Sequence, residues 1–427
     1  MNRIILFFIS LLLFSACDKN EDPSPTPTPE PTQAERTVLI YLSGENNLTQ
    51  DSQYPGESYM DFDMEEILEG SYKLNNNQHL ICFIDSVGKD NKPYFIEVAN
   101  GKAKEVYRYE SDFYASDPAK FREVLQYTID NYPAKEYGLV LWGHASGWIV
   151  HNDSVPNVLK AREVTRGFGK DEGWDTNGSS KWMNITQMAQ ALETIPKLKF
   201  IFADCCNFMC AEVGYELRNC AEYLIGSPAE IPGEGAPYHL MVEKLFSTSP
   251  SFYNDICNCY YDYFIEAYTD PDYRDWDLAG YSVPLSTFRL DQMENLADAT
   301  KQLMKTFMPQ YPEQLDLTNL PYYFFNDRRV LYDMKTVFKK YAPESDYNKW
   351  LKVFNTAVPY QAYSLKWMSI FSTIRNDFDI FPQDTSLWGS VSMFFPQAYY
   401  SNCYFGYNER IRKLQWYNAV DWPSYGW

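Results

Sequence analysis

Residues 137–148 read Tyr-Gly-Leu-Val-Leu-Trp-Gly-His-Ala-Ser-Gly-Trp. The apolar run over 137–142 has the length and composition of a strand that is buried on both faces, which is typical of a parallel sheet. The strand is followed directly by His144, one of only four histidines in the chain. Functional groups in open α/β sheets gather beyond the carboxyl ends of the strands, so His144 is a candidate functional residue.

A second apolar run, over 198–203, is followed by Asp204, Cys205 and Cys206. Side chains alternate along a strand, which predicts that Asp204 and Cys206 share one face and Cys205 points to the other. Cys206 is therefore the candidate nucleophile, and Cys205 is a packing residue. The helix expected over 211–218 would direct the positive end of its dipole toward the sulfur and favour the thiolate.

The rest of the folded chain alternates between strands and helices. Strands are predicted over 38–42, 79–84 and 222–225, a hairpin over 94–109, and helices over 59–68, 118–132 and 185–195. This order predicts an α/β/α sandwich with a mostly parallel central sheet. We expect a catalytic domain over 36–245 and a helix-rich, aromatic C-terminal region over 246–427 that packs on it.

The N-terminus has the pattern of a secretory signal. One basic residue precedes an apolar run over 4–14, which is too short to span a bilayer as a helix. The sequence Phe-Ser-Ala-Cys that ends at Cys17 resembles a bacterial lipobox, in which this cysteine carries the lipid, and plain secretion is the alternative. Segment 18–35 alternates proline with other residues and predicts an extended linker. Its acidic start resembles an export signal of surface lipoproteins, so we expect an anchor in the bacterial outer membrane.

The charge of the chain excludes one class of partner. It carries 37 basic and 57 acidic residues, a net charge of −20, and its pI is near 4.7. Nucleic acid is not expected as a partner, because binding to phosphates needs a basic surface. The acidic surface would attract cationic substrates, or it would serve only to keep the protein in solution.

The two strand-end signals together are similar to a known family. An apolar strand that ends in His, followed by one that ends in Asp-x-Cys, resembles the clostripain family of caspase-fold cysteine peptidases. Segments 40–48, 230–235 and 389–396 resemble that family's first strand with its Asn-Asn-Leu turn, its Pro-Gly-x-Gly loop and its late Ser-x-x-Phe-Pro strand. Two positions depart from the pattern, because Ala145 stands where the family usually has Gly, and Cys205 where it usually has Ala.

The resemblance implies an endopeptidase that cuts after Arg or Lys. Cys206 would form a thioester acyl-enzyme, and His144 would protonate the leaving amine and then activate water. The backbone N–H groups of Ala145 and Cys206 would hold the oxyanion. Asp204, with Glu234 as a second acid, would bind the basic P1 side chain, and this chemistry needs no cofactor.

The resemblance also implies regulation. Family members are often zymogens that cleave themselves between the His and Cys segments, and basic residues are present in that interval: Lys160, Arg162, Arg166, Lys170 and Lys181. Some relatives need calcium, and the acidic cluster over 270–277 offers oxygen ligands. A solvated loop is the alternative there, because no EF-hand spacing is present, and no residue is assigned to a metal.

Two other functions remain open from the sequence. The 35 Tyr, 27 Phe and 11 Trp residues would suit a surface lipoprotein that binds glycans through aromatic stacking. Such a protein would have no use for His144 and Cys206. The chain could also be an inactive peptidase homologue that kept the fold for binding.

Overall fold

The computed structural model describes residues 33–49, 58–88, 91–149, 167–173, 180–267, 281–311, 314–326, 328–369, 381, 384–402 and 406–427. Within the chain, Ala34–Trp427 forms one compact unit. The predictions for the leader and for the acidic cluster over 270–277 lie outside the described residues. So do Cys17 and most of the linker.

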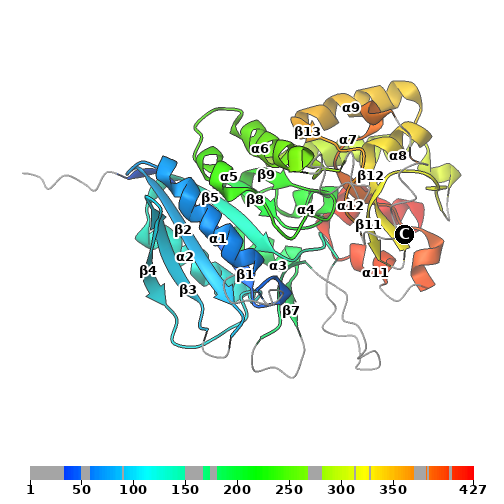
Figure 1. The fold of residues 1–427 in the computed structure, drawn as a ribbon. Helices are drawn as coiled ribbons and strands as arrows, with labels where there is room; N and C mark the ends of the chain where they lie inside the picture. The colour runs from blue at the N-terminus through cyan, green and yellow to red at the C-terminus, as the bar shows by residue number, and fades with distance from the viewer. Residues whose placement is uncertain are drawn as a thin grey trace, which may run out of the picture. The chain divides into compact units, whose positions relative to one another are not determined.

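A central sheet of nine strands organises this unit, in the order β13-β10-β9-β8-β5-β1-β2-β3-β4 (Figure 1). Its five middle strands run parallel, and the outer four are antiparallel to their neighbours. The predicted mostly parallel α/β class is therefore confirmed. The strands are β1 (Ala34–Gly44), β2 (Gln78–Ser86), β3 (Tyr94–Ala99), β4 (Lys102–Arg108), β5 (Ala134–Gly143), β8 (Leu198–Asp204), β9 (Ala221–Gly226), β10 (Leu285–Arg289) and β13 (Tyr360–Ala362).

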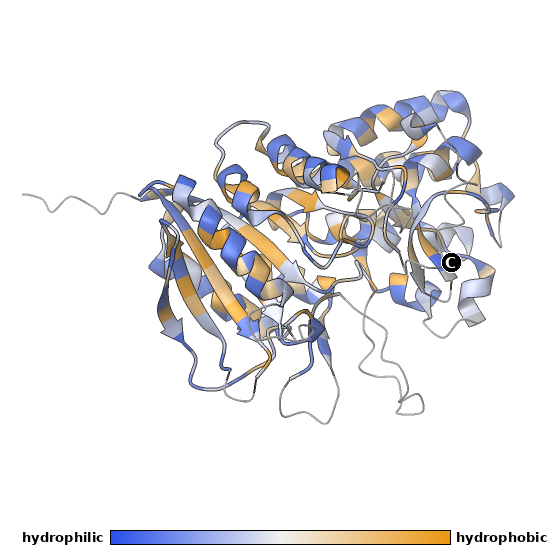
Figure 2. Ribbon diagram, in the orientation of Figure 1, coloured by the Kyte–Doolittle hydropathy of each residue, from blue (hydrophilic) through white to orange (hydrophobic). Residues whose placement is uncertain are grey.

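Helices cover both faces of the sheet. One buried core lies between the sheet and α1 (Tyr59–Gly70), α5 (Tyr238–Leu245) and α6 (Phe252–Ala267). A second core lies against α2 (Pro118–Asn131), α3 (Ile185–Leu192), α4 (Ala211–Glu216) and α7 (Met293–Met304). Figure 2 shows hydrophobic residues along the middle strands and hydrophilic residues on the outer sides of the helices. Burial on both faces explains why these strands are apolar throughout.

Local signals fix the ends of several elements. The Asp117 carboxylate accepts hydrogen bonds from the N–H groups of Ala119 at 2.8 Å and Lys120 at 3.1 Å, which caps α2. The predicted β3–β4 hairpin turns at Asn100 and Gly101, whose φ angles are both positive, at 51° and 69°. Both residue types tolerate that conformation, so the position of the turn was readable from the sequence.

The chain beyond residue 245 takes part in the same sheet. Strands β10 and β13 extend it past β9, and a separate small sheet joins β11 (Tyr322–Asn326), β12 (Arg328–Asp333) and β14 (Ser392–Phe394). The remaining helices are α8 (Met334–Tyr341), α9 (Glu344–Ala357), α11 (Tyr407–Ile411) and α12 (Gln415–Ala419). The domain boundary at residue 245 falls at the end of α5 and stays a prediction.

The segment between β5 and α3, for which the sequence predicted no strand or helix, contains a short hairpin. Its strands are β6 (Phe168–Asp171) and β7 (Lys181–Met183). Among the residues that the structure describes, no helix combines the length and the apolar character needed to cross a bilayer.

Candidate active site

The two candidate catalytic residues leave adjacent strands at the same level. Strands β5 and β8 are parallel neighbours, and Trp142 is paired with Asp204 in their register. His144 and Cys206 each lie two residues beyond that pair. Since neighbouring strands are about 4.7–4.9 Å apart, the register brings the imidazole and the thiol to adjoining loops at the carboxyl edge of the sheet. The sequence predicted both strands, but their adjacency is decided by the sheet order.

Glycines shape the loop that carries His144. Gly143 has a φ of 139°, and a Cβ there would lie 2.8 Å from the backbone oxygen of Ser43. Gly147 has a φ of 69°, and a Cβ there would lie 2.7 Å from the backbone oxygen of Asn207. The histidine loop therefore packs tightly against β1 on one side and against the cysteine loop on the other, which leaves no room for a side chain.

The imidazole of His144 is held by Asn47, which sequence reasoning had not assigned a role. Nε2 of His144 lies 2.7 Å from Oδ1 of Asn47 in the short turn after β1. If the amide oxygen accepts, Nε2 carries the proton and Nδ1 is the nitrogen available for proton exchange. The Asn-Asn-Leu turn in the sequence was the signal that pointed to this position. Gly169 of β6 also donates its N–H to the backbone oxygen of His144, at 2.9 Å.

Cys206 is half-buried, and its sulfur accepts a hydrogen bond from the N–H of Ile231 at 3.4 Å. Burial and the nearby Glu230 carboxylate raise the pKa of the thiol to about 12, whereas the Ile231 bond acts in the opposite direction. The helix dipole that the sequence suggested does not outweigh these effects. Helix α4 begins only at Ala211 and has six residues, so burial and the neighbouring negative charge dominate.

Cys205 and Asp204 occupy opposite faces of the sheet, as the alternation predicted. Cys205 is fully buried in the core beneath α2, α3 and α4, and burial raises the pKa of its thiol well above its usual value. Asp204 turns toward α5 and α6, where tyrosines of both helices reach it. Cys205 therefore has the surroundings of a packing residue, not of a nucleophile.

The backbone of Ala145 faces away from the β6 hairpin. Ala145 forms an isolated bridge with Phe168, but the hydrogen bonds of this bridge run from Ser146 to Gly167 and from Gly169 to His144. In the described part of the chain no hydrogen bond uses the N–H of Ala145. The methyl group that replaces the hydrogen of glycine is buried, since Ala145 is 8% exposed. The arrangement leaves this N–H available to an oxyanion.

Asp204 is buried, at 2% exposure, and its carboxylate accepts three hydrogen bonds. Tyr238 and Tyr260 donate their hydroxyls at 2.8 and 2.9 Å, and Ala236 donates its N–H at 3.1 Å. Burial nevertheless raises the pKa of Asp204. The structure thus places Asp204 beneath the 232–236 turn rather than open to solvent.

A second buried carboxylate, Asp63 of α1, lies beside Asp204. A Cβ on Gly235 would lie 3.0 Å from Oδ2 of Asp204 and 3.2 Å from Oδ2 of Asp63, so both oxygens face the same point. Trp142 donates its indole N–H to Asp63 at 2.5 Å. Burial and the charge of Asp204 raise the pKa of Asp63 well above its usual value. Glu234 is exposed on the adjacent turn. Sequence reasoning missed Asp63, which lies in an ordinary helical segment.

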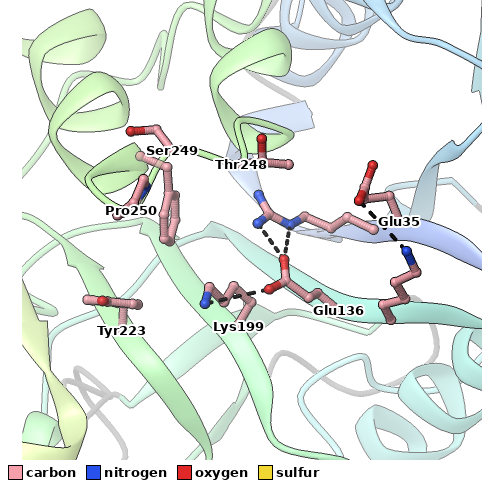
Figure 3. A pocket seen from close by; sticks show the side chains of 10 residues that line it. Glu35, Glu136, Lys199, Tyr223, Thr248, Ser249 and Pro250 are labelled. Carbon is pink, nitrogen blue, oxygen red and sulfur yellow. Dashed lines mark hydrogen bonds and ion pairs between the residues drawn. The ribbon is translucent and has the colours of Figure 1, made fainter.

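A pocket at the opposite edge of the sheet is unrelated to these residues (Figure 3). It lies at the amino ends of β1, β5 and β8, and its charged side chains pair with one another. Arg36 bonds to Glu136 at 2.6 Å and to the backbone oxygens of Leu245 and Ser247, and Lys199 lies 3.5 Å from Glu136. These contacts tie the strand ends to the loop after α5, which is a structural role.

Comparison with known proteins identifies the family of the chain. The model of the clostripain family matches residues 40–427. The chain belongs to the clostripain family. This is a family of cysteine-type peptidases, as the sequence resemblance indicated.

The individual family members that resemble this chain are distant from it in sequence. Clostripain of Hathewaya histolytica is 22% identical over 237 residues, which is 49% of this chain and 42% of that protein. The fold is similar to a secreted C11 cysteine protease of Bacteroides thetaiotaomicron solved with an irreversible peptide inhibitor, with a TM-score of 0.72 and 24% identity over 92% of this chain and all of that one. It is also similar to an inactive zymogen of a C11 protease of Parabacteroides distasonis, with a TM-score of 0.69 and 24% identity over 92% and 99% of the two chains. These likenesses confirm the caspase-like fold.

Proposed function

We propose that this chain is a cysteine endopeptidase in which Cys206 is the nucleophile and His144 the general acid and base. The observation that carries the proposal is the pairing of β5 with β8, which delivers both residues to one edge of the sheet at equal register. His144 takes the thiol proton as Cys206 attacks the scissile carbonyl, and it passes this proton to the leaving amine when the C–N bond breaks and the thioester forms. His144 then takes a proton from the water that attacks the thioester, and it returns this proton to the Cys206 sulfur as the C–S bond breaks and the acid is released.

Three features of the site support this chemistry. Asn47 orients the imidazole from the side opposite to the proton-exchanging nitrogen. The N–H of Ala145 and the N–H of Cys206 are the proposed donors to the oxyanion, and the first makes no hydrogen bond among the described residues. Side chains and backbone alone perform these steps, so the proposed reaction itself uses no cofactor.

The substrates proposed are proteins or peptides with Arg or Lys at P1. Asp63, Asp204 and Glu234 gather three carboxyl groups around the 232–236 turn, next to the nucleophile. A cationic side chain there would favour the ionised form of the buried pair, because an opposite charge lowers the pKa of a carboxylate. A neutral side chain of the same shape would lack this interaction.

A zymogen form is also proposed. The chain is similar in fold to an inactive zymogen of a C11 protease, and burial with the Glu230 carboxylate raises the pKa of the Cys206 thiol to about 12, which disfavours the nucleophilic thiolate in the uncleaved chain. Cleavage between the His and Cys segments is the proposed activating step. Of the candidate cleavage residues, Lys170 lies in β6 and Lys181 in β7, and the other three lie outside the described residues.

We further propose an extracellular or envelope location with a lipid anchor on Cys17. The similar protein of Bacteroides thetaiotaomicron is described as secreted. Labelling with a fatty-acid analogue in the bacterial host, lost on Cys17→Ala, would establish the anchor and its contact with the membrane. A nucleic-acid partner is not part of the proposal, given the net charge of −20.

The test is cleavage of fluorogenic peptides by the chain from Asp18 onward, which keeps the compact unit Ala34–Trp427 intact. Peptides with Arg or Lys at P1 are compared with a matched peptide carrying citrulline, the neutral analogue of Arg. Cys206→Ala should abolish cleavage and Cys205→Ala, the matched control, should retain it. Absence of cleavage by the wild type, even after nicking by trypsin and with added calcium, would contradict the proposal and favour an inactive homologue.

A further inference from the structure

A second group of acidic side chains lies near the carboxyl ends of β1 and β2. Glu45 follows β1, Asp85 is the penultimate residue of β2, and Asp112 precedes α2. One carboxylate oxygen of each residue lies within 4.8 Å of those of the other two. Glu45 and Asp85 are only 2% and 1% exposed, whereas Asp112 is at the surface. The three residues come from segments 27 or more positions apart, so the fold brings them together.

The buried members of this group have no donors of their own. Among the residues that the structure describes, neither oxygen of Glu45 and neither oxygen of Asp85 receives a hydrogen bond from an N–H or hydroxyl group, and the side-chain contact of each is with the Asp171 carboxyl. A buried carboxylate without a donor or a counter-charge is strongly unfavourable, and such groups are normally satisfied by a partner or a metal ion. Two of them side by side add mutual repulsion. Burial raises the pKa of Glu45 to about 9 and that of Asp85 well above its usual value.

A fourth carboxylate, Asp171 of β6, completes the group. Its oxygens accept the N–H groups of Ala115 at 2.6 Å and Gly173 at 3.0 Å, which fixes its orientation. Its charge acts on both Glu45 and Asp85. Each of its oxygens keeps a lone pair for a further ligand. The group therefore offers carboxylate oxygens from four segments of the chain.

We propose that Glu45, Asp85 and Asp112, with Asp171 beside them, bind one calcium ion. The donors are all oxygens with no sulfur or imidazole, which favours a hard cation over zinc. A set of several protein carboxylates favours calcium over magnesium, because magnesium retains most of its water and demands a strict octahedron. The site is distinct from the 270–277 cluster that the sequence suggested.

The proposed ion would also support the catalytic histidine. Glu45 is two residues from Asn47, whose side chain holds the His144 imidazole. Glu172, next to Asp171, donates its N–H to the backbone oxygen of Glu45 at 2.8 Å, so β6 and the turn after β1 are joined at the site. An ion that draws Glu45 and Asp171 together would fix both segments that position His144. This effect on catalysis rests on the proposed function, whereas binding of the ion does not.

Binding is tested on the Cys206→Ala chain from Asp18 onward, which cannot cleave itself by the proposed mechanism. After removal of metals with EDTA, terbium is titrated and its luminescence, sensitised by nearby aromatic rings, is followed, with calcium as competitor. We expect one terbium per chain, displaced by calcium, and a rise of a few degrees in Tm with calcium. Glu45→Gln and Asp85→Asn should weaken binding at least tenfold, and the exposed Glu65→Gln should bind as the parent does.

Further variants keep the proposal falsifiable if a buried substitution fails to fold. Asp112→Asn changes an exposed side chain and should also weaken binding. Asp270→Asn combined with Asp272→Asn should leave binding unchanged. The proposal is overturned if no ion binds at millimolar calcium, which would mean that the carboxyls are simply protonated, or if only the 270–272 variant loses binding.

A final measurement addresses catalysis with Cys206 present. EDTA should lower kcat for an Arg peptide more than it raises KM, calcium should restore it, and Glu45→Gln should no longer respond to calcium. Binding without any effect of EDTA on kcat would overturn the link to His144. Because terbium binding is measured on the inactive variant, failure of the peptidase proposal and failure of the calcium proposal remain distinguishable.

Discussion

Glu212, in the first turn of α4, provides a quantitative test of how burial raises the pKa of a carboxyl group near the cysteine loop. Its side chain is fully buried, and one oxygen accepts the N–H of Phe394 at 2.8 Å, which ties the helix after the cysteine loop to β14. The other oxygen has no donor among the described residues. Burial raises the pKa of Glu212 from 4.5 to about 8. The folded protein therefore holds a proton that the unfolded chain releases above pH 4.5.

The sign of the effect follows from proton linkage. Because the folded state binds more protons between pH 4.5 and 8, stability falls as the pH rises through that window. One pKa unit corresponds to about 1.4 kcal/mol. The raised pKa of Glu212 therefore lowers the free energy of unfolding by about 3 to 4 kcal/mol between pH 5 and pH 8. Glu212→Gln is neutral at every pH and keeps an oxygen for Phe394. We expect this variant to lose about 3 to 4 kcal/mol less stability than the parent over the same interval.

The assay is urea unfolding of Cys206→Ala and of Cys206→Ala with Glu212→Gln, at pH 5 and pH 8 in EDTA. Glu193→Gln, which changes an exposed carboxylate, is the matched control and should follow the parent. Equal loss of stability in the parent and the Glu212 variant would refute the reasoning, because it would mean that Glu212 is ionised in the folded protein at pH 8.

Two substitutions test the catalytic loops. Glu230→Gln removes a negative charge that raises the pKa of Cys206, so alkylation by iodoacetamide should reach its half-maximal rate at lower pH than in the parent; an unchanged profile would show that burial alone sets the thiol pKa. Gly143→Ala places a Cβ 2.8 Å from the backbone oxygen of Ser43 at a φ of 139°, so it should displace His144 and lower kcat/KM by on the order of a hundredfold. Activity close to that of the wild type in this variant would show that the loop does not hold the imidazole rigidly.

The sequence by itself determined the elements and the chemical candidates. Apolar runs of five or six residues marked β1, β2, β5 and β8, because strands buried on both faces carry no polar alternation. Asp117 and Asn100-Gly101 marked a helix start and a turn through local geometry that needs no tertiary contact. The opposite orientation of Asp204 and Cys205 followed from strand alternation alone.

The tertiary structure determined which residues from other segments lie beside these candidates. Asn47 beside His144, Asp63 beside Asp204, and Glu45 beside Asp85 are pairs from segments that the sheet order and helix packing bring together. No local pattern in the sequence carries that information. The pKa of Cys206 shows the consequence. The sequence predicted a helix dipole that favours the thiolate, but desolvation and the charge of Glu230 outweigh it, and both depend on the folded surroundings of the sulfur.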